Sequence, residues 1–479
     1  MNSTFRKVVE EVLRSVVPSS EDKDRVRSTT ELVRTLVLEE IKKTDLIVDV
    51  VAGGSVAKDT WLREDEDIDL FMLFSTSISK KDLGETGLAI AKRAVSRYRQ
   101  RERYAEHVYL EAWVNKIRVN IVPCYKTDRG EWLSAADRSP YHTQYVIEKL
   151  EAKPLEDDIR VFKRFIKGIG SYGAEIRVKG LSGYLCELLV LHYGSFSKAL
   201  KAISKWRFGE LIDPEKLYVK RQEEAKKLFN APLIVIDPVD QNRNVAAAVS
   251  KERMSELIAA TRFFLDIPLK SFFYPEETEP SLEELQNMLS PLNYDIIAIE
   301  FRICEKVPDI LWGELSKTKS ALRYILEKND FVVLRSDVWS DELRSSVIVF
   351  SLENLTLARC RRHQGPPGDT EGVKPFLEKY ATDAVTGPWV ENGKWIAAVK
   401  RHYISAESLL KDTLSDGGSV AGVSRGLVEP LVSSRLLVGA EILGMCGKKG
   451  FSKFLKRFIR GGPQWLSGSH SSSSSDSFP

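Results

Sequence analysis

The sequence predicts an α+β protein of several domains, and three observations support this expectation. Its 479 residues correspond to about three domains at roughly 150 residues each. Hydrophobic residues make up 43% of the chain and charged residues 29%, a composition typical of folded globular proteins. Short β-branched runs alternate with amphipathic stretches in the first part of the chain, a mainly helical stretch follows, and strand patterns return after it.

Residues 1–150 are expected to form one α/β domain. Its helices are predicted from apolar residues at three- and four-residue spacing, and its strands from short β-branched runs. The predicted order is helix 22–44, strands 46–55 and 68–74, helix 86–102, and strands 107–114 and 116–125. The last two strands are joined by a polar turn at Asn115-Lys116.

Residues 151–265 are expected to form a mainly helical domain. After Pro154, an apolar stripe from Leu155 to Ile169 predicts a helix with one buried side. Its basic residues fall on the other side, so the pattern by itself favours solvent exposure for Arg160, Lys163, Arg164 and Lys167. A second helical stretch is predicted over 183–203.

Residues 266–445 are expected to form an α+β body and tail. Strand 295–303, helix 312–329 and strands 330–339 and 345–352 follow one another in an order consistent with a small ferredoxin-like sheet. The Gly- and Pro-rich segment 364–372 is interpreted as a loop.

The last segment, 446–479, combines a basic amphipathic stretch with a Ser-rich end. Residues 447–460 contain six basic residues, no acidic one, and apolar residues on one side. Docking of that side on the body is favoured over contact with RNA or with a membrane. The Ser-rich residues beyond it are expected to be disordered.

Several classes of protein are disfavoured by composition. Five cysteines lie far apart without a CxxC pair, which argues against a zinc ribbon and a disulfide scaffold. No apolar run reaches the roughly 18 residues of a membrane span, and the N-terminus does not have the pattern of a signal peptide. We therefore expect a cytoplasmic protein without a membrane partner. A net charge of +3 means that nucleic-acid affinity must come from local basic patches.

The segment 53–74 contains the residues most indicative of chemistry. Gly53-Gly54-Ser55 can offer backbone N–H groups and a hydroxyl to a phosphate, although such a turn alone is a weak signal. Asp67 and Asp69 open an apolar strand, where residues i and i+2 point to the same face. Two carboxylates there can hold Mg²⁺ against a triphosphate. The alternative is that the two aspartates lie on a solvated strand edge. The apolar residues that follow them indicate a buried strand and weaken this alternative.

This combination resembles the nucleotidyltransferase superfamily that includes DNA polymerase β. Further segments resemble archaeal CCA-adding enzymes, the class I tRNA nucleotidyltransferases, over about residues 1–410 and most densely before 250. They are, in order, GGSVAKDTWL, DIDLF, YAEH, VPCY, SAADRSPYH, IRVFKRFIKGIGSYGAE, GLSGYLCELLVLHYGSF, DPVDQNRNVAAAVS and GPWVENGKWIAAVKR.

The resemblance implies a polymerase β-like nucleotidyltransferase head, a helical neck, and an α+β body and tail that hold tRNA. It implies Mg²⁺-dependent, template-independent addition of C, C and A from CTP and ATP to the tRNA 3′ end, with release of pyrophosphate. Candidate RNA contacts outside the site are the basic segments 359–363, 400–403 and 447–460. The oligomeric state stays open, and a homodimer is compatible with the sequence.

The resemblance also implies roles for individual residues. The metal ligands would be Asp67 and Asp69. Ser55 and Lys58 would hold the triphosphate, and Lys163 and Tyr172 would contact triphosphate and sugar. The nucleotide pocket would be lined by Glu106, His107, Ser139 and His142, and Arg243 would help to select C and A. Outside this context, these histidines could be structural and Arg243 an ordinary surface residue.

Asn120 departs from the pattern, because the superfamily has a third metal-binding carboxylate at this position. An amide can still ligate a metal ion, but it brings no charge and cannot act as a base. Three explanations stay open: another acid such as Glu111 compensates, the two aspartates suffice, or the chain is a weakened or inactive tRNA-binding relative. A different RNA nucleotidyltransferase, such as a poly(A) polymerase, is a further alternative that CTP use would distinguish.

Overall fold

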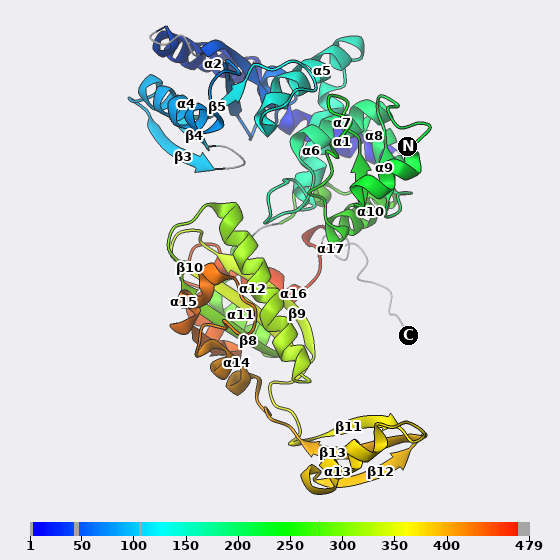
Figure 1. Ribbon diagram of the computed structural model, residues 1–479. Coiled ribbons are helices and arrows are strands. Elements are labelled where there is room, and N and C mark those ends of the chain that lie inside the picture. Colours follow the sequence, from blue (N-terminus) through cyan, green and yellow to red (C-terminus); the bar gives the residue numbers. More distant parts are fainter. Residues whose placement is uncertain (1–2, 43–46, 105–107, 277, 468–479) are drawn as a thin grey trace. The chain divides into compact units, whose positions relative to one another are not determined.

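The computed structural model describes residues 3–42, 47–104, 108–276 and 278–467. The chain forms two compact units (Figure 1). The N-terminal unit comprises Met1–Glu276 together with Gly462–Pro479, and the C-terminal unit comprises Glu277–Gly461. Within these described ranges, no helix is long and apolar enough to cross a membrane.

The N-terminal unit begins with two helices and a five-stranded sheet. The helices are α1 (Ser3–Val16) and α2 (Ser20–Ile41), and α2 starts where Ser19 and Asp22 form a reciprocal capping box. The strands lie in the order β1 (Ile47–Gly53), β2 (Asp67–Phe74), β5 (Ile117–Tyr125), β4 (Val108–Val114) and β3 (Arg99–Tyr104). Only the β2–β5 pair is parallel among these pairings.

The predicted helix 86–102 is wrong in its extent. Helix α4 spans Lys80–Ala94, and Arg99–Tyr104 form β3 at the edge of the sheet. The sequence RQRERY has no apolar alternation, but charged residues are common on edge strands because they hinder pairing with other chains. The predicted turn at Asn115-Lys116 is confirmed, since both residues have positive φ, as tight hairpins require.

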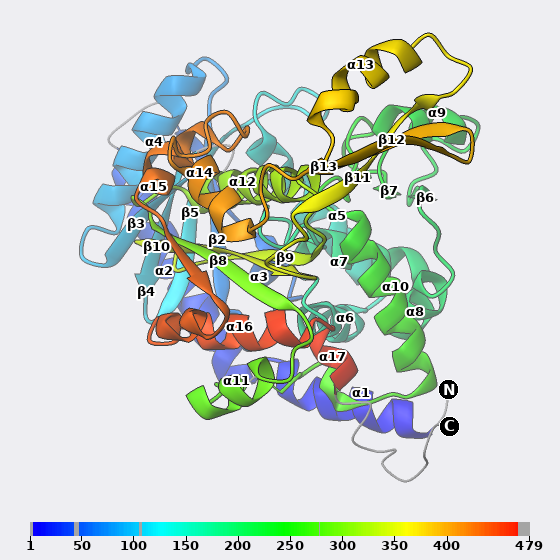
Figure 2. The same ribbon diagram turned by 90° about the horizontal axis from the view of Figure 1, so that it is seen from below.

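A group of helices follows in the same unit, and Figures 1 and 2 both show α6, α7, α8 and α10 close together. The elements are α5 (Arg138–Ala152), α6 (Glu156–Gly168), α7 (Gly183–Tyr193), α8 (Phe196–Ile203), β6 (Glu210–Ile212), α9 (Gln222–Phe229), β7 (Leu233–Val235) and α10 (Lys251–Asp266). The single helix predicted over 183–203 is wrong, because Gly194, at φ +81°, ends α7 and Ser195 caps α8.

The helical group has an aromatic core. The ring of Phe165 from α6 lies against those of Phe196, Phe264, Phe272 and Phe273. All five rings are almost completely buried, so the apolar stripe predicted for this helix is confirmed.

The basic side of the same helix α6 does not behave as its pattern suggests. Arg160 and Lys163 are each only 2% exposed, so solvent exposure is wrong for both. Arg160 donates to the carbonyl of Trp61 at 3.1 Å and pairs with Asp59 at 2.6 Å. Buried charges need such partners, and the partners here come from a distant part of the sequence.

The main sheet of the C-terminal unit is antiparallel, in the order β14-β8-β10-β9. Its elements are β8 (Asp295–Arg302), α12 (Pro308–Lys328), β9 (Val333–Ser340), β10 (Ser345–Leu352) and β14 (Arg435–Val438). This chain order and strand order give a ferredoxin-like sheet, as predicted, with β14 as the fourth strand.

A second sheet lies between β10 and β14 in the chain. It has the order β11 (Cys360–Pro367), β13 (Lys394–Lys400) and β12 (Thr386–Glu391), with α13 (Val373–Asp383) packed against it. The loop predicted over 364–372 is therefore wrong in its first half, which continues β11. Outside the two sheets lie α11 (Leu282–Leu289), α14 (Ala406–Leu414) and α15 (Val428–Val432).

The basic amphipathic stretch forms α16 (Phe451–Arg460) and docks on the main sheet, as favoured from sequence. Its apolar residues, among them Phe451 and Phe458, join the core that includes side chains of β8 and β10. Lys448, just before the helix, pairs with Glu300, and Lys456 pairs with Glu284. The chain then returns to the N-terminal unit, where Trp465 of α17 (Gln464–Ser467) stacks on Phe272.

Candidate active site

Three neighbouring strands of the N-terminal sheet place polar residues in one row, and a glycine of β1 continues it. Strand register puts Gly53 beside Asp69, Asp69 beside Asn120, and Asn120 beside Glu111. The Nδ2 group of Asn120 donates to Asp69 Oδ1 at 2.9 Å. Asp67 lies two residues from Asp69 on β2, so both carboxylates are on the same face of the sheet.

The Gly-Gly-Ser turn lies directly against this row. Gly54 opens the short helix α3 (Gly54–Ala57) with φ +67°. A Cβ atom at this position would lie 2.0 Å from Asp69 Oδ2, so only glycine fits both the backbone angle and the space. Ser55 and the aspartates, which the sequence separates by a dozen residues, therefore belong to one site.

Arginines already engage the carboxylates on this face. Arg118 donates through Nε to Asp67 Oδ1 at 2.8 Å and through Nη2 to Asp67 Oδ2. Glu111 is only 3% exposed and pairs with Arg103 at 3.0 Å and with Arg118 at 3.6 Å. The acid that could compensate for Asn120 is thus neutralised by two guanidinium groups.

The donor set nevertheless fits a divalent cation. Two carboxylates on one face supply the oxygen ligands that hard cations take. Burial raises the pKa of Asp69, although the hydrogen bond from Asn120 lowers it in part. Such a desolvated carboxylate gains from a nearby positive charge. Among the described residues, no group of three or more His, Cys, Asp or Glu is arranged for a metal ion.

The two lysines predicted to bind phosphate share one buried carboxylate, that of Glu187. Lys58 Nζ lies 2.5 Å from Glu187 Oε2, and Lys163 Nζ lies 2.7 Å from Glu187 Oε1. Thr60 Oγ1 also donates to Glu187 Oε1, at 2.5 Å. Burial raises and the two lysines lower the pKa of Glu187, with a net fall to about 2, so this group is ionised at neutral pH.

A second buried carboxylate, Asp237, gathers His142 and Arg243. His142 Nε2 lies 2.9 Å from Asp237 Oδ2, and Arg243 Nη1 donates to the same oxygen at 2.8 Å. The backbone N–H of Val239 donates to Oδ1. Burial opposes ionisation of Asp237, but the hydrogen bond from His142 and the other contacts lower its pKa to about 2. Burial lowers the pKa of His142, which favours the neutral ring.

Tyr184 joins the two carboxylate clusters. Its ring stacks on His142, with ring centroids 4.1 Å apart, and its hydroxyl donates to Asp237 Oδ1 at 3.3 Å. Lys58 Nζ lies 5.7 Å from the centre of the same ring, within range of a cation–π contact. Lys163, Glu187, Lys58, Tyr184, His142, Asp237 and Arg243 therefore form one continuous chain of contacts.

The remaining predicted residues have less distinctive surroundings. Ser139 lies one turn before His142 on α5, and its carbonyl accepts a hydrogen bond from Thr143 at 3.0 Å. Burial raises the pKa of Tyr172 well above its usual value, and Lys167 Nζ lies 5.9 Å from its ring centre. Glu106 and His107 lie outside the described residues.

Sequence reasoning missed Glu187, Asp237 and Tyr184. The only available signal was their position inside two of the quoted segments, GLSGYLCELLVLHYGSF and DPVDQNRNVAAAVS. Glu187 stands in an otherwise apolar helix, where an acid needs a buried partner. The partners are residues of other elements, which no local pattern reveals.

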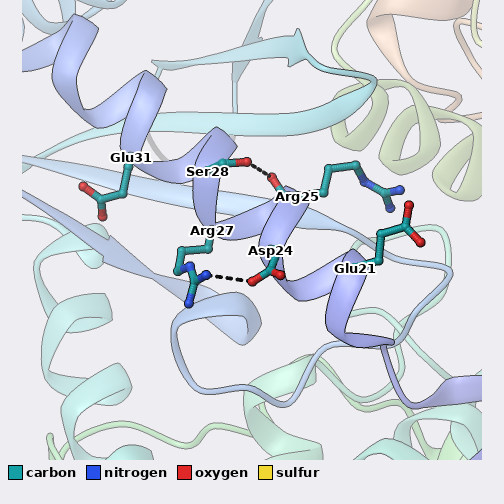
Figure 3. Close-up of a pocket in the computed structure, with 6 residues that line it drawn as sticks. All are labelled: Glu21, Asp24, Arg25, Arg27, Ser28 and Glu31. Atoms are coloured by element: carbon teal, nitrogen blue, oxygen red, sulfur yellow. Dashed lines mark hydrogen bonds and ion pairs between the residues drawn. The ribbon is translucent and has the colours of Figure 1, made fainter.

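A different depression, along α2, has no such organisation (Figure 3). It is lined by six residues of this one helix, namely Glu21, Asp24, Arg25, Arg27, Ser28 and Glu31. Arg27 donates to Asp24 at 2.7 Å, and Ser28 donates to the carbonyl of Arg25 at 3.0 Å, both within the helix. This depression is a charged surface of α2, and none of the residues that line it is a predicted residue of the site.

Comparison with known proteins gives consistent matches along the chain. Residues 35–152 match the family described as nucleotidyltransferase domain, residues 157–274 that of tRNA nucleotidyltransferase, second domain, and residues 294–426 that of CCA-adding enzyme, C-terminal domain. These three ranges cover most of both structural units.

Curated relatives agree over nearly full length. The CCA-adding enzyme of Methanoregula boonei is 34% identical, over 92% of this chain and 93% of its own. That of Pyrobaculum aerophilum is 37% identical, over 87% and 95%. That of Methanopyrus kandleri is 34% identical, over 96% and 98%.

Proposed function

The chain belongs to the family of CCA-adding enzymes, and on this premise we propose that the site around Asp67 and Asp69 is where it adds C, C and A to the 3′ end of tRNA. The substrates are CTP, ATP and a tRNA that lacks its terminal nucleotides, and pyrophosphate is the second product. The observation that carries the site proposal is that the turn at Gly54 lies against Asp69, because Ser55 and Lys58 follow this turn within four residues.

Asp67 and Asp69 would hold the divalent cation that the nucleotidyltransferase family implies, and we propose Mg²⁺. When bound, it would supply positive charge to the triphosphate and lower the pKa of the attacking hydroxyl. Asn120 stabilises the carboxylate of Asp69 through a hydrogen bond but contributes no charge. Arg118 donates to both oxygens of Asp67, so an oxygen that becomes a ligand would use another lone pair.

Lys58 and Ser55 would donate hydrogen bonds to phosphate oxygens. Lys163 would add its positive charge to the triphosphate site, since Glu187 and Thr60 engage its three N–H donors. Arg243 offers a rigid fork of donors that suits a base edge, and Asp237 fixes its orientation. Ser139 and His142 would line the nucleotide pocket, to which Glu106 and His107 are also assigned, and Tyr172 would contact the triphosphate and sugar. In this proposal the α-phosphate would lie beside the two aspartates, where the 3′ end of the tRNA would be extended.

The C-terminal unit would hold the acceptor stem. A-form RNA is recognised through its phosphates and 2′-hydroxyls, for which exposed arginines are suitable donors. Arg361 and Arg362 on β11 are both exposed and make ion pairs with Asp330 and Glu391, at 3.7 and 3.1 Å.

We also propose a cytoplasmic location for the protein. We propose a homodimer as its oligomeric state, which light scattering would test. No observation favours a poly(A) polymerase or an inactive relative.

The test is incorporation of labelled CTP and ATP, with Mg²⁺, into tRNA that lacks its CCA end. We expect the wild type to add two C and one A in order, and Asp69→Ala to lose this activity. Asp49→Ala is the matched control, because Asp49 is exposed on the neighbouring strand β1 of the same sheet. Full activity in Asp69→Ala, or loss of activity in Asp49→Ala, would contradict the assignment.

A further inference from the structure

Two buried cations share one anion in the N-terminal unit. Lys58 and Lys163 are 7% and 2% exposed, and Glu187 is 1% exposed. Both ammonium groups contact the same carboxylate, each on its own oxygen. Two positive charges against one negative charge leave an excess of one positive charge in a region with little access to water. Such an excess is costly unless a further anion binds beside it.

The other groups around the lysines do not supply that anion. Cys186 and Tyr184, both on α7, have pKa values raised by burial, so both are neutral at physiological pH. His142 from α5 is kept neutral by burial, and the hydroxyl of Tyr172 lies near Gly183 and is also neutral. Asp69 from β2 acts on Lys58 only at longer range.

We propose that Glu187 is a positioning residue for the triphosphate: it keeps Lys58 and Lys163 protonated together and fixes the spacing of their ammonium groups. This inference rests on the proposed function. Each lysine has three N–H donors and gives one to Glu187, and Lys163 gives two more to Thr60. Lys58 therefore keeps donors for phosphate oxygens, while Lys163 is held rigidly beside it.

Removal of the anion has a defined electrostatic consequence. In Glu187→Gln the two ammonium groups would repel each other in a desolvated site, so one lysine would lose its proton well below its ordinary pKa. The charge of this lysine would then be present below the lowered pKa and lost as the pH rises through it. Binding of a triphosphate restores a negative partner, so the neutral lysine would take up a proton when the nucleotide binds.

Proton uptake can be measured without catalysis. We would titrate the full-length protein with CTP at pH 8, without tRNA, by calorimetry in two buffers of different ionisation enthalpy. Burial lowers the pKa of Lys163 already in the wild type, so we expect little net uptake from the wild type and up to about one further proton per CTP from Glu187→Gln. The CTP affinity of this variant should fall by up to about tenfold for each pH unit above the lowered lysine pKa.

Glu215→Gln is the matched control. Glu215 belongs to the same unit, is more exposed than Glu187, and pairs with Lys149 at 2.8 Å. We expect the wild-type proton count from this variant. Uptake in Glu215→Gln equal to that of Glu187→Gln would overturn the proposal, because the effect would then not be specific to Glu187.

A second variant separates charge from geometry. Glu187→Asp keeps the charge but is one methylene shorter, so it cannot contact both lysines at once. Its proton count should stay near that of the wild type while its CTP affinity falls. If Glu187→Gln does not fold, unchanged CTP affinity in Glu187→Asp would overturn the proposal.

The outcomes also distinguish this inference from the proposed function. Absence of CTP binding in the wild type would contradict the proposed function itself. Normal wild-type binding with equal proton counts in Glu187→Gln, or tighter binding by this variant at every pH, would contradict only the role of Glu187. The last result would mean that the carboxylate merely repels the triphosphate.

Discussion

Asn120 occupies the centre of the row of side chains on the sheet, between Asp69 and Glu111. Its amide donates to Asp69, whereas a carboxylate at the same place would face another negative charge. Arg118, on the same strand, already engages Asp67. The site is therefore stabilised without a cation by one amide and one guanidinium group.

Asn120→Asp should therefore change both rate and metal dependence. We expect the single-turnover rate to rise by about tenfold or more, because a third carboxylate adds charge and a proton acceptor at the site. With EDTA the variant should unfold at a lower temperature than wild type, because Asp69 and the new carboxylate repel each other. Mg²⁺ should reverse this difference, as thermal unfolding with and without the metal would show.

The affinity for tRNA is the internal control for this substitution. It should stay nearly unchanged, because position 120 belongs to the sheet of the N-terminal unit and not to the arginines proposed to hold RNA. An unchanged single-turnover rate would show that the two aspartates already suffice.

Asp237→Asn tests the second carboxylate at the residue scale. The pKa of Asp237 is lowered to about 2, so its contribution to stability is present above its unfolded pKa of about 4 and is lost between about pH 4 and pH 2. At pH 7 the free energy of unfolding of the variant should be about 2 kcal/mol lower than that of the wild type. Between about pH 4 and pH 2 the variant should lose less stability than the wild type does. Urea unfolding at several pH values would measure both effects.

Nucleotide choice gives a second measure for the same variant. Without Asp237, Arg243 loses the partner that orients it, so misincorporation of UTP in place of CTP should increase. Asp49→Asn, at an exposed position, should behave like wild type in both assays. An acid-induced loss of stability identical to that of wild type would rule out the assigned role of Asp237.

At the scale of elements, the turn between β1 and α3 joins the phosphate-binding segment to the carboxylates. Gly54 requires a positive φ and lies against Asp69, so the turn tolerates no side chain. Gly54→Ala should cost about 1–2 kcal/mol from the backbone angle alone and should displace Asp69. We expect activity to fall by about 100-fold, measured by CTP incorporation.

Gly84→Ala is the control for this turn. Gly84 lies inside α4, and a Cβ atom there would meet no heavy atom within 4 Å. Alanine favours helices by about 1 kcal/mol over glycine, so this variant should be fully active and slightly more stable. Equal activity of the two variants would mean that the turn does not hold Asp69 in place.

At the scale of the whole molecule, the chain crosses between its two units twice, at about residues 276 and 462. Trp465 is 3% exposed and packs in the N-terminal unit, whereas Phe451 is fully buried in the C-terminal unit. Substitution of either aromatic residue by alanine should cost about 3–5 kcal/mol in its own unit.

Scanning calorimetry would test whether the units unfold separately. We expect two transitions, of which Trp465→Ala lowers one and Phe451→Ala lowers the other. If both substitutions lowered the same transition, the units would unfold as one cooperative body.

The order of elements was largely predictable, because periodicity and turn residues act within a few positions of the chain. Four strands of the first sheet, the ferredoxin-like order and the docking of α16 follow from such patterns. The errors arose where tertiary context prevailed: the charged edge strand β3 and the strand β11 have no apolar alternation. The break at Gly194 required a positive φ within an otherwise continuous helical pattern.

The sequence by itself determined the chemistry of this protein: the aspartate pair, the Gly-Gly-Ser turn and the departure at Asn120 are all local features. Only the tertiary structure decided which charges are buried and what neutralises them. Glu187 lies 129 residues from Lys58 and 24 from Lys163, and Asp237 lies 95 from His142. An ion pair depends on distance in space, and in a desolvated interior its partner must be within contact, wherever the chain has placed it in sequence.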